Sequence, residues 1–176
     1  MRNVGKIFED CFVKSIDISH ILVKRLNDNA ASWGQGTQTR FTSTNECDFI
    51  LFDDNSLTLY GLELKSFKSS LTFFREDFVV EEKHQSFEIK KNQILGLKKW
   101  SQHSGVFGFI FNVRCSENHT YFVEINDFLE YTNHLCKKSI NESDILSMHH
   151  LKIECKLRRT NYHYDMEKFF QEKRLS

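Results

Sequence analysis

Residues 47–65 read CDFILFDDNSLTLYGLELK, and this stretch decides the expected fold. Two runs with strand propensity flank the polar residues 53–56, which is the pattern of a β-hairpin. An even-numbered loop centred on Asn55-Ser56 gives a register that pairs residue 52 with 59, 50 with 61 and 48 with 63. The pattern therefore predicts that the carboxylates of Asp48 and Glu63 are direct cross-strand neighbours.

Alternation along the second strand places Lys65 on the same face as Glu63, while Leu62 and Leu64 point to the core. Like charges at opposite positions destabilise a sheet by ~0.2–1 kcal/mol, so a bare pair of acids needs a compensating cation. A divalent metal would supply that charge.

Two carboxylates, a backbone carbonyl and water molecules form an oxygen-rich site of the kind that Mg²⁺ prefers. The predicted metal ligands are Asp48, Glu63 and the backbone carbonyl of Leu64, with Mn²⁺ as a substitute ion. The Lys65 ammonium would then orient the attacking water or neutralise charge that develops on a phosphate. A Glu-x-Lys triplet on a strand is also common as a solvated charged face, and the triplet alone leaves both interpretations open.

Composition predicts one globular domain over residues 1–176. The chain has 17 phenylalanines, enough for a well-packed core, and no proline. Lysine plus arginine and aspartate plus glutamate both number 24, so any nucleic-acid footprint must be local. Five scattered cysteines and the lack of a signal peptide or membrane-length apolar run favour a soluble, cytoplasmic protein.

The segments on either side of the hairpin predict two helices. The first, Gly5–Leu26, carries Glu9, which is either a solvated glutamate or an auxiliary acid of the metal site. The second, Phe87–His103, places Gln93 at the top of an apolar stripe that faces the sheet.

The most basic window of the chain lies around the second helix. A lysine run is usually a solvated face, but beside a metal site it also suits a track for phosphates. The candidate DNA-binding residues are Arg40, Thr42, Lys68, Arg75, Lys83, Lys90, Lys91, Lys98, Lys99, Lys137 and Lys138.

The rest of the chain predicts alternating strands and helices. Strands are expected at Val106–Val113, Thr120–Ile125 and Leu151–Leu157, the first of them buried on both faces. Helices are expected at Asn126–Cys136, with Asn126 as N-cap, and near Asn141–Met148. The predicted fold class is α/β, with a restriction-endonuclease-like mixed β-sheet flanked by helices.

The Asp48…Glu63-x-Lys65 pattern resembles the PD-(D/E)xK nuclease signature. With the opening GKIFED, the block NQILGLKKWSQHSGVFGFIFNV and the later KKSI, the chain resembles the RecU type of Holliday junction resolvase and its bacteriophage relatives from Gly5 to about Leu157. In that family a glutamine opens a helix that is followed by a glycine and an apolar strand. Gln93, Gly105 and Val106 reproduce this feature.

This resemblance implies a homodimeric, Mg²⁺-dependent endonuclease that makes paired, symmetric nicks in four-way DNA junctions. Asp48 and Glu63 would bind the metal, Lys65 would serve the attacking water, and Glu9 and Gln93 would complete the catalytic site. Water activated by the metal would hydrolyse a phosphodiester of DNA.

Two departures accompany the resemblance: Cys47 stands where the signature has proline, and the chain has no net charge. Two alternatives therefore stay open. One is another PD-(D/E)xK nuclease, of restriction or repair type, and the other is a non-catalytic DNA-binding relative. None of these readings involves a membrane.

Overall fold

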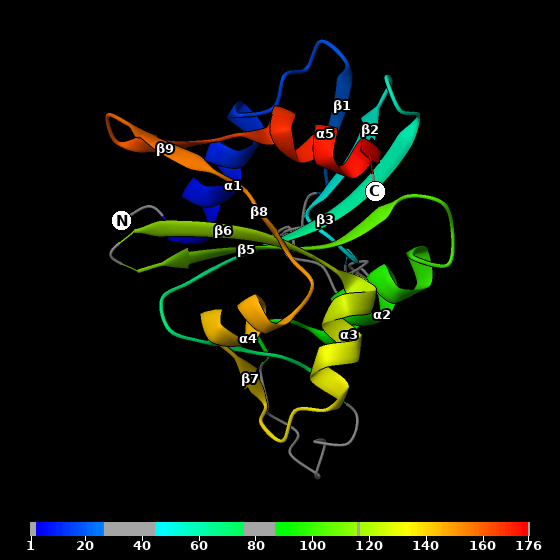
Figure 1. The fold of residues 1–176 in the computed structure, drawn as a ribbon, viewed down its shortest axis with the longest axis vertical. Helices are drawn as coiled ribbons and strands as arrows, with labels where there is room; N and C mark the ends of the chain where they lie inside the picture. Colours follow the sequence, from blue (N-terminus) through cyan, green and yellow to red (C-terminus); the bar gives the residue numbers. More distant parts are fainter. Residues whose placement is uncertain (1–2, 27–44, 76–86, 116, 176) are drawn as a thin grey trace, which may run out of the picture.

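A mixed six-stranded sheet runs through the middle of the molecule (Figure 1). The computed structural model describes residues 3–26, 45–75, 87–115 and 117–175. The strand order is β1-β2-β3-β5-β6-β8; β3 and β5 run parallel, and the other neighbours run antiparallel. The strands are β1 Ile21–Arg25, β2 Phe49–Asp53, β3 Thr58–Phe67, β5 Val106–Arg114, β6 Asn118–Glu124 and β8 Leu151–Lys152.

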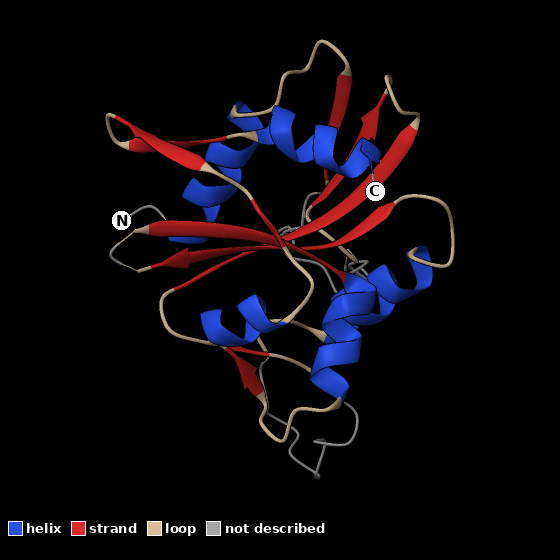
Figure 2. Ribbon diagram, viewed as in Figure 1, coloured by secondary structure: helices blue, strands red, loops and turns tan. Residues whose placement is uncertain are grey.

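Helices cover both faces of this sheet (Figure 2). One face packs against α1 Val4–Lys14, α5 Met166–Leu175 and the hairpin of β9 Cys155–Arg158 and β10 Asn161–Tyr164. The other packs against α2 Lys91–Trp100, α3 Ile125–Asn133, α4 Glu142–Ser147 and the small sheet of β4 Leu71–Thr72 and β7 Ser139–Ile140. The predicted class, α/β with a mixed sheet flanked by helices, is confirmed.

The β2–β3 hairpin has the predicted register. Ile50 lies opposite Gly61 and Phe52 opposite Leu59, as predicted, and the ladder ends at Phe49 opposite Leu62, so the predicted pair of residues 48 and 63 lies just beyond it. The four loop residues 54–57 end on Leu57, whose φ of 53° closes the turn.

Strand β5 is buried on both faces, as predicted from its apolar sequence. Phe107, Phe109 and Phe111 pack on the α2 side, and Ile110 packs on the α1 side. Each fully buried side chain of this size contributes ~1.5–3 kcal/mol of transfer free energy, so β5 anchors the two cores to each other.

The predicted helix Gly5–Leu26 is wrong in its second half. Helix α1 ends at Lys14, where the Ser15 amide and hydroxyl bond back to the preceding turn, and the chain then forms the edge strand β1. Phe8, Cys11 and Phe12 nevertheless form the expected buried face. The β-branched residues of β1 pair with β2, and this tertiary pairing outweighs the helical periodicity.

Other boundaries also differ from the predictions. Helix α2 begins only at Lys91, because Ile89 is held in a bridge to Phe73. Helix α3 starts at Ile125 with Glu124 as N-cap, so the predicted cap at Asn126 is wrong.

The C-terminal part contains more structure than predicted. The strand Leu151–Leu157 divides into β8 and β9, since Ile153 bonds to the Thr120 carbonyl before the chain turns away. Strand β10 and helix α5 were not predicted. The helix expected near Asn141–Met148 is α4, and its N-cap Asn141 accepts from the Asp144 amide. None of the helices in the described part of the chain has the length and apolar character needed to cross a bilayer.

Candidate active site at the start of strand β2

Asp48 is fixed between two strands. Its amide donates to the Leu62 carbonyl at 3.1 Å, and its carbonyl accepts from the Leu26 amide at 2.8 Å. The carboxylate then turns towards β3, where Oδ2 accepts a hydrogen bond from the Leu64 amide at 2.8 Å. The Asp48 carboxylate therefore lies against the backbone of the residue between Glu63 and Lys65.

Glu63 is a buried carboxylate held by two donors. Its residue surface is 2% exposed, and its Oε1 accepts from Lys65 Nζ at 2.8 Å and from Gln93 Nε2 at 2.5 Å. Lys65 shares the face of Glu63 as expected, while Leu62 and Leu64 lie in the core on the other side. A carboxylate is this deeply buried only when it is paired, because an unpaired charge would lose its hydration without compensation.

Gln93 reaches Glu63 because α2 packs tightly against the segment that leads into β2. The Gln93 Oε1 accepts from the Lys90 amide at 2.9 Å, which fixes the side chain at the first turn of the helix. Asn92 Nδ2 donates to the Asn45 carbonyl at 2.7 Å. The helical spacing predicted that Gln93 faces the sheet, and in the structure its side chain contacts Glu63 there.

Gly96 makes the close approach of α2 possible. A Cβ atom at this position would lie 2.1 Å from Cγ and 2.3 Å from Cβ of Glu46. A side chain at residue 96 would therefore push α2 away from the chain just before Asp48.

Glu9 lies on the α1 side of the same site. Burial, followed by the charge of Asp48, raises the pKa of Glu9 above its ordinary value, although the Arg25 guanidinium opposes the shift. Arg25 forms an ion pair with Glu9 and lies 3.9 Å from Asp10. Glu9 therefore lies within the electrostatic reach of Asp48, where an auxiliary acid belongs.

Sequence reasoning missed Arg25. The predicted helix placed it remote from the hairpin, whereas β1 pairs Arg25 with Phe49, next to Asp48. The signal that could have found it is the apolar run Ile21-Leu22-Val23, two of whose three residues are β-branched and therefore suit a strand.

Cys47, which replaces the proline of the nuclease signature, is a core residue. Burial first, and then the charges of Glu63 and Asp48, raise the pKa of its thiol to about 12. The neutral thiol bonds to the Phe49 carbonyl at 3.4 Å. The thiol is therefore protonated at neutral pH and serves packing at the start of β2.

The donor set fits a hard divalent cation. Asp48 lies just before β2 with its carboxylate on the amide of Leu64, the residue after Glu63, and Glu9 adds a third acid on the α1 side. Their ligand atoms are not gathered within 4.8 Å of one another: Arg25 pairs with Glu9, and the Lys65 and Gln93 nitrogens contact Glu63. Oxygen ligands with neighbouring cationic donors are chemistry suited to Mg²⁺.

The predicted DNA-binding residues divide into three groups. Arg40, Thr42 and Lys83 lie outside the described residues. Most of the others are exposed lysines: Lys68 follows β3, Lys138 precedes β7, and the rest lie at or in α2, namely Lys90, Lys91, Lys98 and Lys99.

Arg75 and Lys137, also predicted to contact DNA, bond to other residues of the fold. The Arg75 guanidinium donates to the carbonyls of Thr132 and Leu135 at 2.5 and 2.6 Å, at the end of α3. Lys137 Nζ lies 2.6 Å from Oδ2 of Asp144. Arg75 thereby satisfies helix-end carbonyls, a structural task that its position in the sequence did not reveal.

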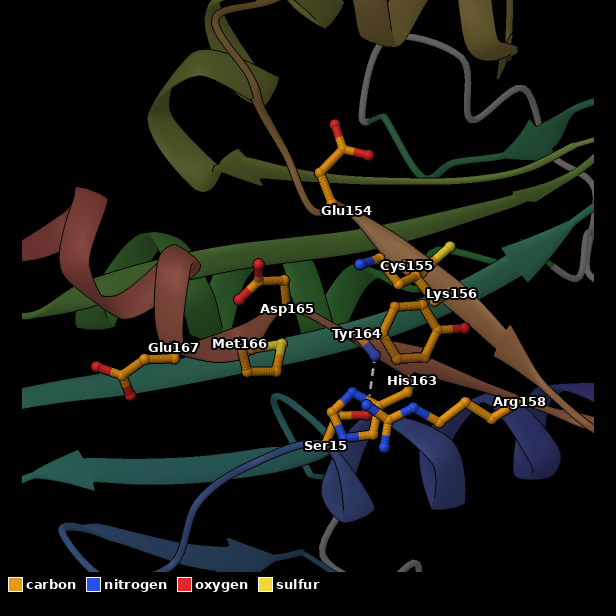
Figure 3. A pocket seen from close by; sticks show the side chains of 10 residues that line it. All are labelled: Ser15, Glu154, Cys155, Lys156, Arg158, His163, Tyr164, Asp165, Met166 and Glu167. Atoms are coloured by element: carbon orange, nitrogen blue, oxygen red, sulfur yellow. Dashed lines mark hydrogen bonds between the residues drawn. The ribbon is translucent and has the colours of Figure 1, made fainter.

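A separate cavity of about 260 Å³ lies between the end of α1, the β9–β10 hairpin and the start of α5 (Figure 3). The Tyr164 amide donates to Ser15 Oγ at 3.0 Å across its floor. The described residues that line this cavity include none of the predicted site residues, so it is distinct from the acids at β2 and β3.

No protein-family model matches the chain. Among curated proteins, the SPbeta prophage-derived uncharacterized protein YotM of Bacillus subtilis (strain 168) is 33% identical over 153 residues. The match spans 82% of this chain and 71% of the relative. At this identity and coverage, the chain belongs to the same family as that SPbeta prophage-derived protein.

Proposed function

We propose that the chain is a Mg²⁺-dependent DNA endonuclease with the restriction-endonuclease-like fold, and that it cuts four-way junctions as RecU-type resolvases do. One observation carries the proposal: Glu63 is buried between Lys65 and Gln93, and the Asp48 carboxylate accepts from the amide of the next residue, Leu64. The bacteriophage branch of the resemblance agrees with the SPbeta prophage origin of the relative.

The burial of the acid argues against a merely solvated Glu-x-Lys face. The side chains of Glu63 and Lys65 are 2% and 16% exposed. Removing an ion pair from water is unfavourable, and replacing buried pairs by apolar residues is often neutral or stabilising. A buried pair in the middle of an apolar sheet is therefore better explained by chemistry than by stability.

The proposed metal ligands are Asp48, Glu63 and the Leu64 carbonyl, with Mn²⁺ able to substitute. When bound, the metal supplies Lewis-acid polarisation of the phosphate and acidifies a bound water. The protein residues around it have separate tasks. Lys65 orients the water and neutralises charge on the phosphate, Gln93 holds Glu63 in place, and Glu9 adds an outer acid.

The exposed lysines at α2 would contact phosphates beside the site. Lys90 precedes the helix by one residue and its amide bonds to Gln93, so the lysine track begins at the acids themselves. Phosphate contacts of this kind position DNA without reading its sequence. A chain with no net charge has no overall attraction to DNA, and this local group of lysines would supply the attraction instead.

Resolution of a junction requires two cuts. One site cleaves one strand, so we propose a symmetric homodimer whose two sites are related by a two-fold axis. Paired nicks at symmetric positions are then the expected product.

The test compares a labelled four-way junction with a linear duplex of the same arms, in Mg²⁺ and in EDTA. We expect symmetric nicks in the junction alone, lost in EDTA and in Glu63→Gln. Cutting of both substrates would contradict junction selectivity and leave a nuclease of another type. Binding of the junction with no Mg²⁺-dependent cutting would overturn the enzymatic proposal and favour a non-catalytic DNA-binding protein.

A further inference from the structure

Three side chains that commonly bind metals meet at the far end of the β5–β6 hairpin. Cys115 follows β5, His119 lies in β6, and Glu142 is the first residue of α4. One ligand atom from each lies within 4.8 Å of the other two. Thiolate, imidazole and carboxylate are the three side-chain ligands that zinc sites combine.

The spacing of these atoms suits a tetrahedral ion. Zinc bonds of about 2.3 Å to sulfur and 2.0 Å to nitrogen place those two ligands about 3.5 Å apart. The structure has 3.7 Å between Cys115 Sγ and His119 Nδ1. His119 Nδ1 lies 2.6 Å from Glu142 Oε1, so the carboxylate needs to retreat by less than about 1 Å to admit the ion.

Outer contacts already orient two of these ligands. The other imidazole nitrogen, His119 Nε2, lies 3.5 Å from the Glu117 carboxylate, and the Tyr121 hydroxyl donates to Glu142 Oε1 at 2.8 Å. A carboxylate behind a histidine and a donor behind a carboxylate are the usual supports of metal ligands.

The backbone also holds the third ligand. Asn141 and Asp144 exchange hydrogen bonds of 2.8 and 3.1 Å at the start of α4, which fixes the position of Glu142. Cys115 is exposed, and its thiol donates to the Glu117 carbonyl at 2.6 Å. Its sulfur is thus accessible to an ion from solvent.

We propose that Cys115, His119 and Glu142 bind one Zn²⁺ ion, which clamps the β5–β6 hairpin to α4. The thiol proton of Cys115 passes to solvent as the thiolate binds, and a water molecule fills the fourth position. A thiolate favours zinc over Mg²⁺, so this site is separate from the acids at Asp48. The proposal does not depend on the nuclease activity.

The test titrates the reduced, full-length, metal-free protein with Co²⁺ and then displaces it with Zn²⁺. We expect one Co²⁺ per chain with thiolate-to-metal charge-transfer absorption, lost in Cys115→Ser. Cys136→Ser is the matched control, because Cys136 is also a single exposed cysteine, and it should keep the absorption. Asp48→Asn should keep it too, which separates this site from the proposed active site.

Glu142→Gln and His119→Ala test the other two ligands. We expect each to weaken Zn²⁺ binding at least about tenfold, and Zn²⁺ to raise the melting temperature of the wild type but not of Cys115→Ser. Binding of zinc by Cys115→Ser with wild-type affinity would overturn the proposal. So would the absence of stoichiometric binding to the wild type.

Discussion

At Glu63 the chain buries a carboxylate on the face of a sheet and surrounds it with nitrogen donors. Lys65 and Gln93 both reach the same oxygen, Oε1. Removing Lys65 or Gln93 would leave the buried Glu63 carboxylate with one donor fewer to compensate its charge. The charge of Lys65 therefore matters to the arrangement of the site as well as to the proposed chemistry.

Lys65→Ala should reduce Mg²⁺-dependent nicking by about 10²–10³-fold, because it removes a preorganised cationic donor beside the reacting phosphate. Single-turnover cleavage of a labelled junction measures the loss. Lys14→Ala is the control, since Lys14 is an exposed lysine at the end of α1. Equal rates for Lys65→Ala and the wild type would exclude Lys65 from the chemistry.

Arg25 is a positioning residue for Glu9, and the two should behave as a unit. Arg25→Ala and Glu9→Gln should each slow cleavage about tenfold, and the double variant should be little slower than either single one. Arg25→Lys, which keeps the charge, should recover part of the rate. Single-turnover rates of the four variants check this, and losses that multiply in the double variant would show that the residues act independently.

The contacts of the site could be predicted from the sequence where they follow strand or helix periodicity. Asp48, Glu63 and Lys65 are set by hairpin register, and Gln93 by its position on α2. Arg25 could not be found while its segment was assigned to a helix, because its role depends on which strand pairs with β2.

At the scale of elements, the packing of α2 against residues 45–48 decides where Gln93 lies. The helix approaches so closely at Gly96 that a methyl group there would overlap the Glu46 side chain. Helix propensity thus favours alanine at residue 96, whereas the packing against Glu46 requires glycine.

Gly96→Ala should destabilise the protein by about 1–3 kcal/mol, because the overlap with Glu46 outweighs the gain of about 1 kcal/mol that alanine brings to a helix. Urea unfolding measures the change. Leu95→Ala on the same helix, at a residue that is 43% exposed, is a control for which we expect less than about 0.5 kcal/mol. A Gly96→Ala protein more stable than the wild type would show that α2 can shift freely.

Elements were predictable where one physical signal dominates. Strand β5 is apolar along its length, and α4 carries its own cap in Asn141. Helix α5 shows buried residues at helical spacing, Met166, Phe169 and Phe170, a signal present in the sequence but not used. Strand β8 could not be delimited, because its end depends on where the chain leaves the sheet.

At the scale of the molecule, one ion pair ties the hairpin to the C-terminal helix. Arg174 Nε lies 2.7 Å from Oδ2 of Asp53, whose side chain is fully buried. Burial alone would raise the pKa of Asp53, but the hydrogen bonds from Arg174, Ser56 and the Asn55 amide outweigh burial and lower it below its ordinary value.

Asp53→Asn should lower the free energy of unfolding by about 2–3 kcal/mol at pH 7, because it removes the nearer and buried of the two carboxylates that pair with Arg174. The folded-state pKa is depressed, so the stabilisation is full above the unfolded value of about 3.9 and is lost as the pH falls through the folded pKa. The difference between the wild type and Asp53→Asn in urea unfolding should therefore shrink below about pH 4. A difference that is unchanged at low pH would exclude the ion pair as its source.

The distribution of charge over the whole chain and the association of two chains both bear on the proposed DNA substrate. Four exposed lysines, Lys90, Lys91, Lys98 and Lys99, lie at or in α2 while the net charge is zero, so the phosphate contacts that we propose would be local. Junction selectivity depends on how two such sites are spaced, which follows from the association of two chains and not from the hairpin.

The rate of Mg²⁺-dependent junction nicking in Asp48→Asn tests the central claim most directly. Asp54→Asn is the matched control, because Asp54 is an exposed aspartate in the turn of the same hairpin. We predict a loss of about 10³-fold or more for Asp48→Asn, since it removes a proposed metal ligand, and a wild-type rate for Asp54→Asn. Wild-type nicking by Asp48→Asn would contradict the account.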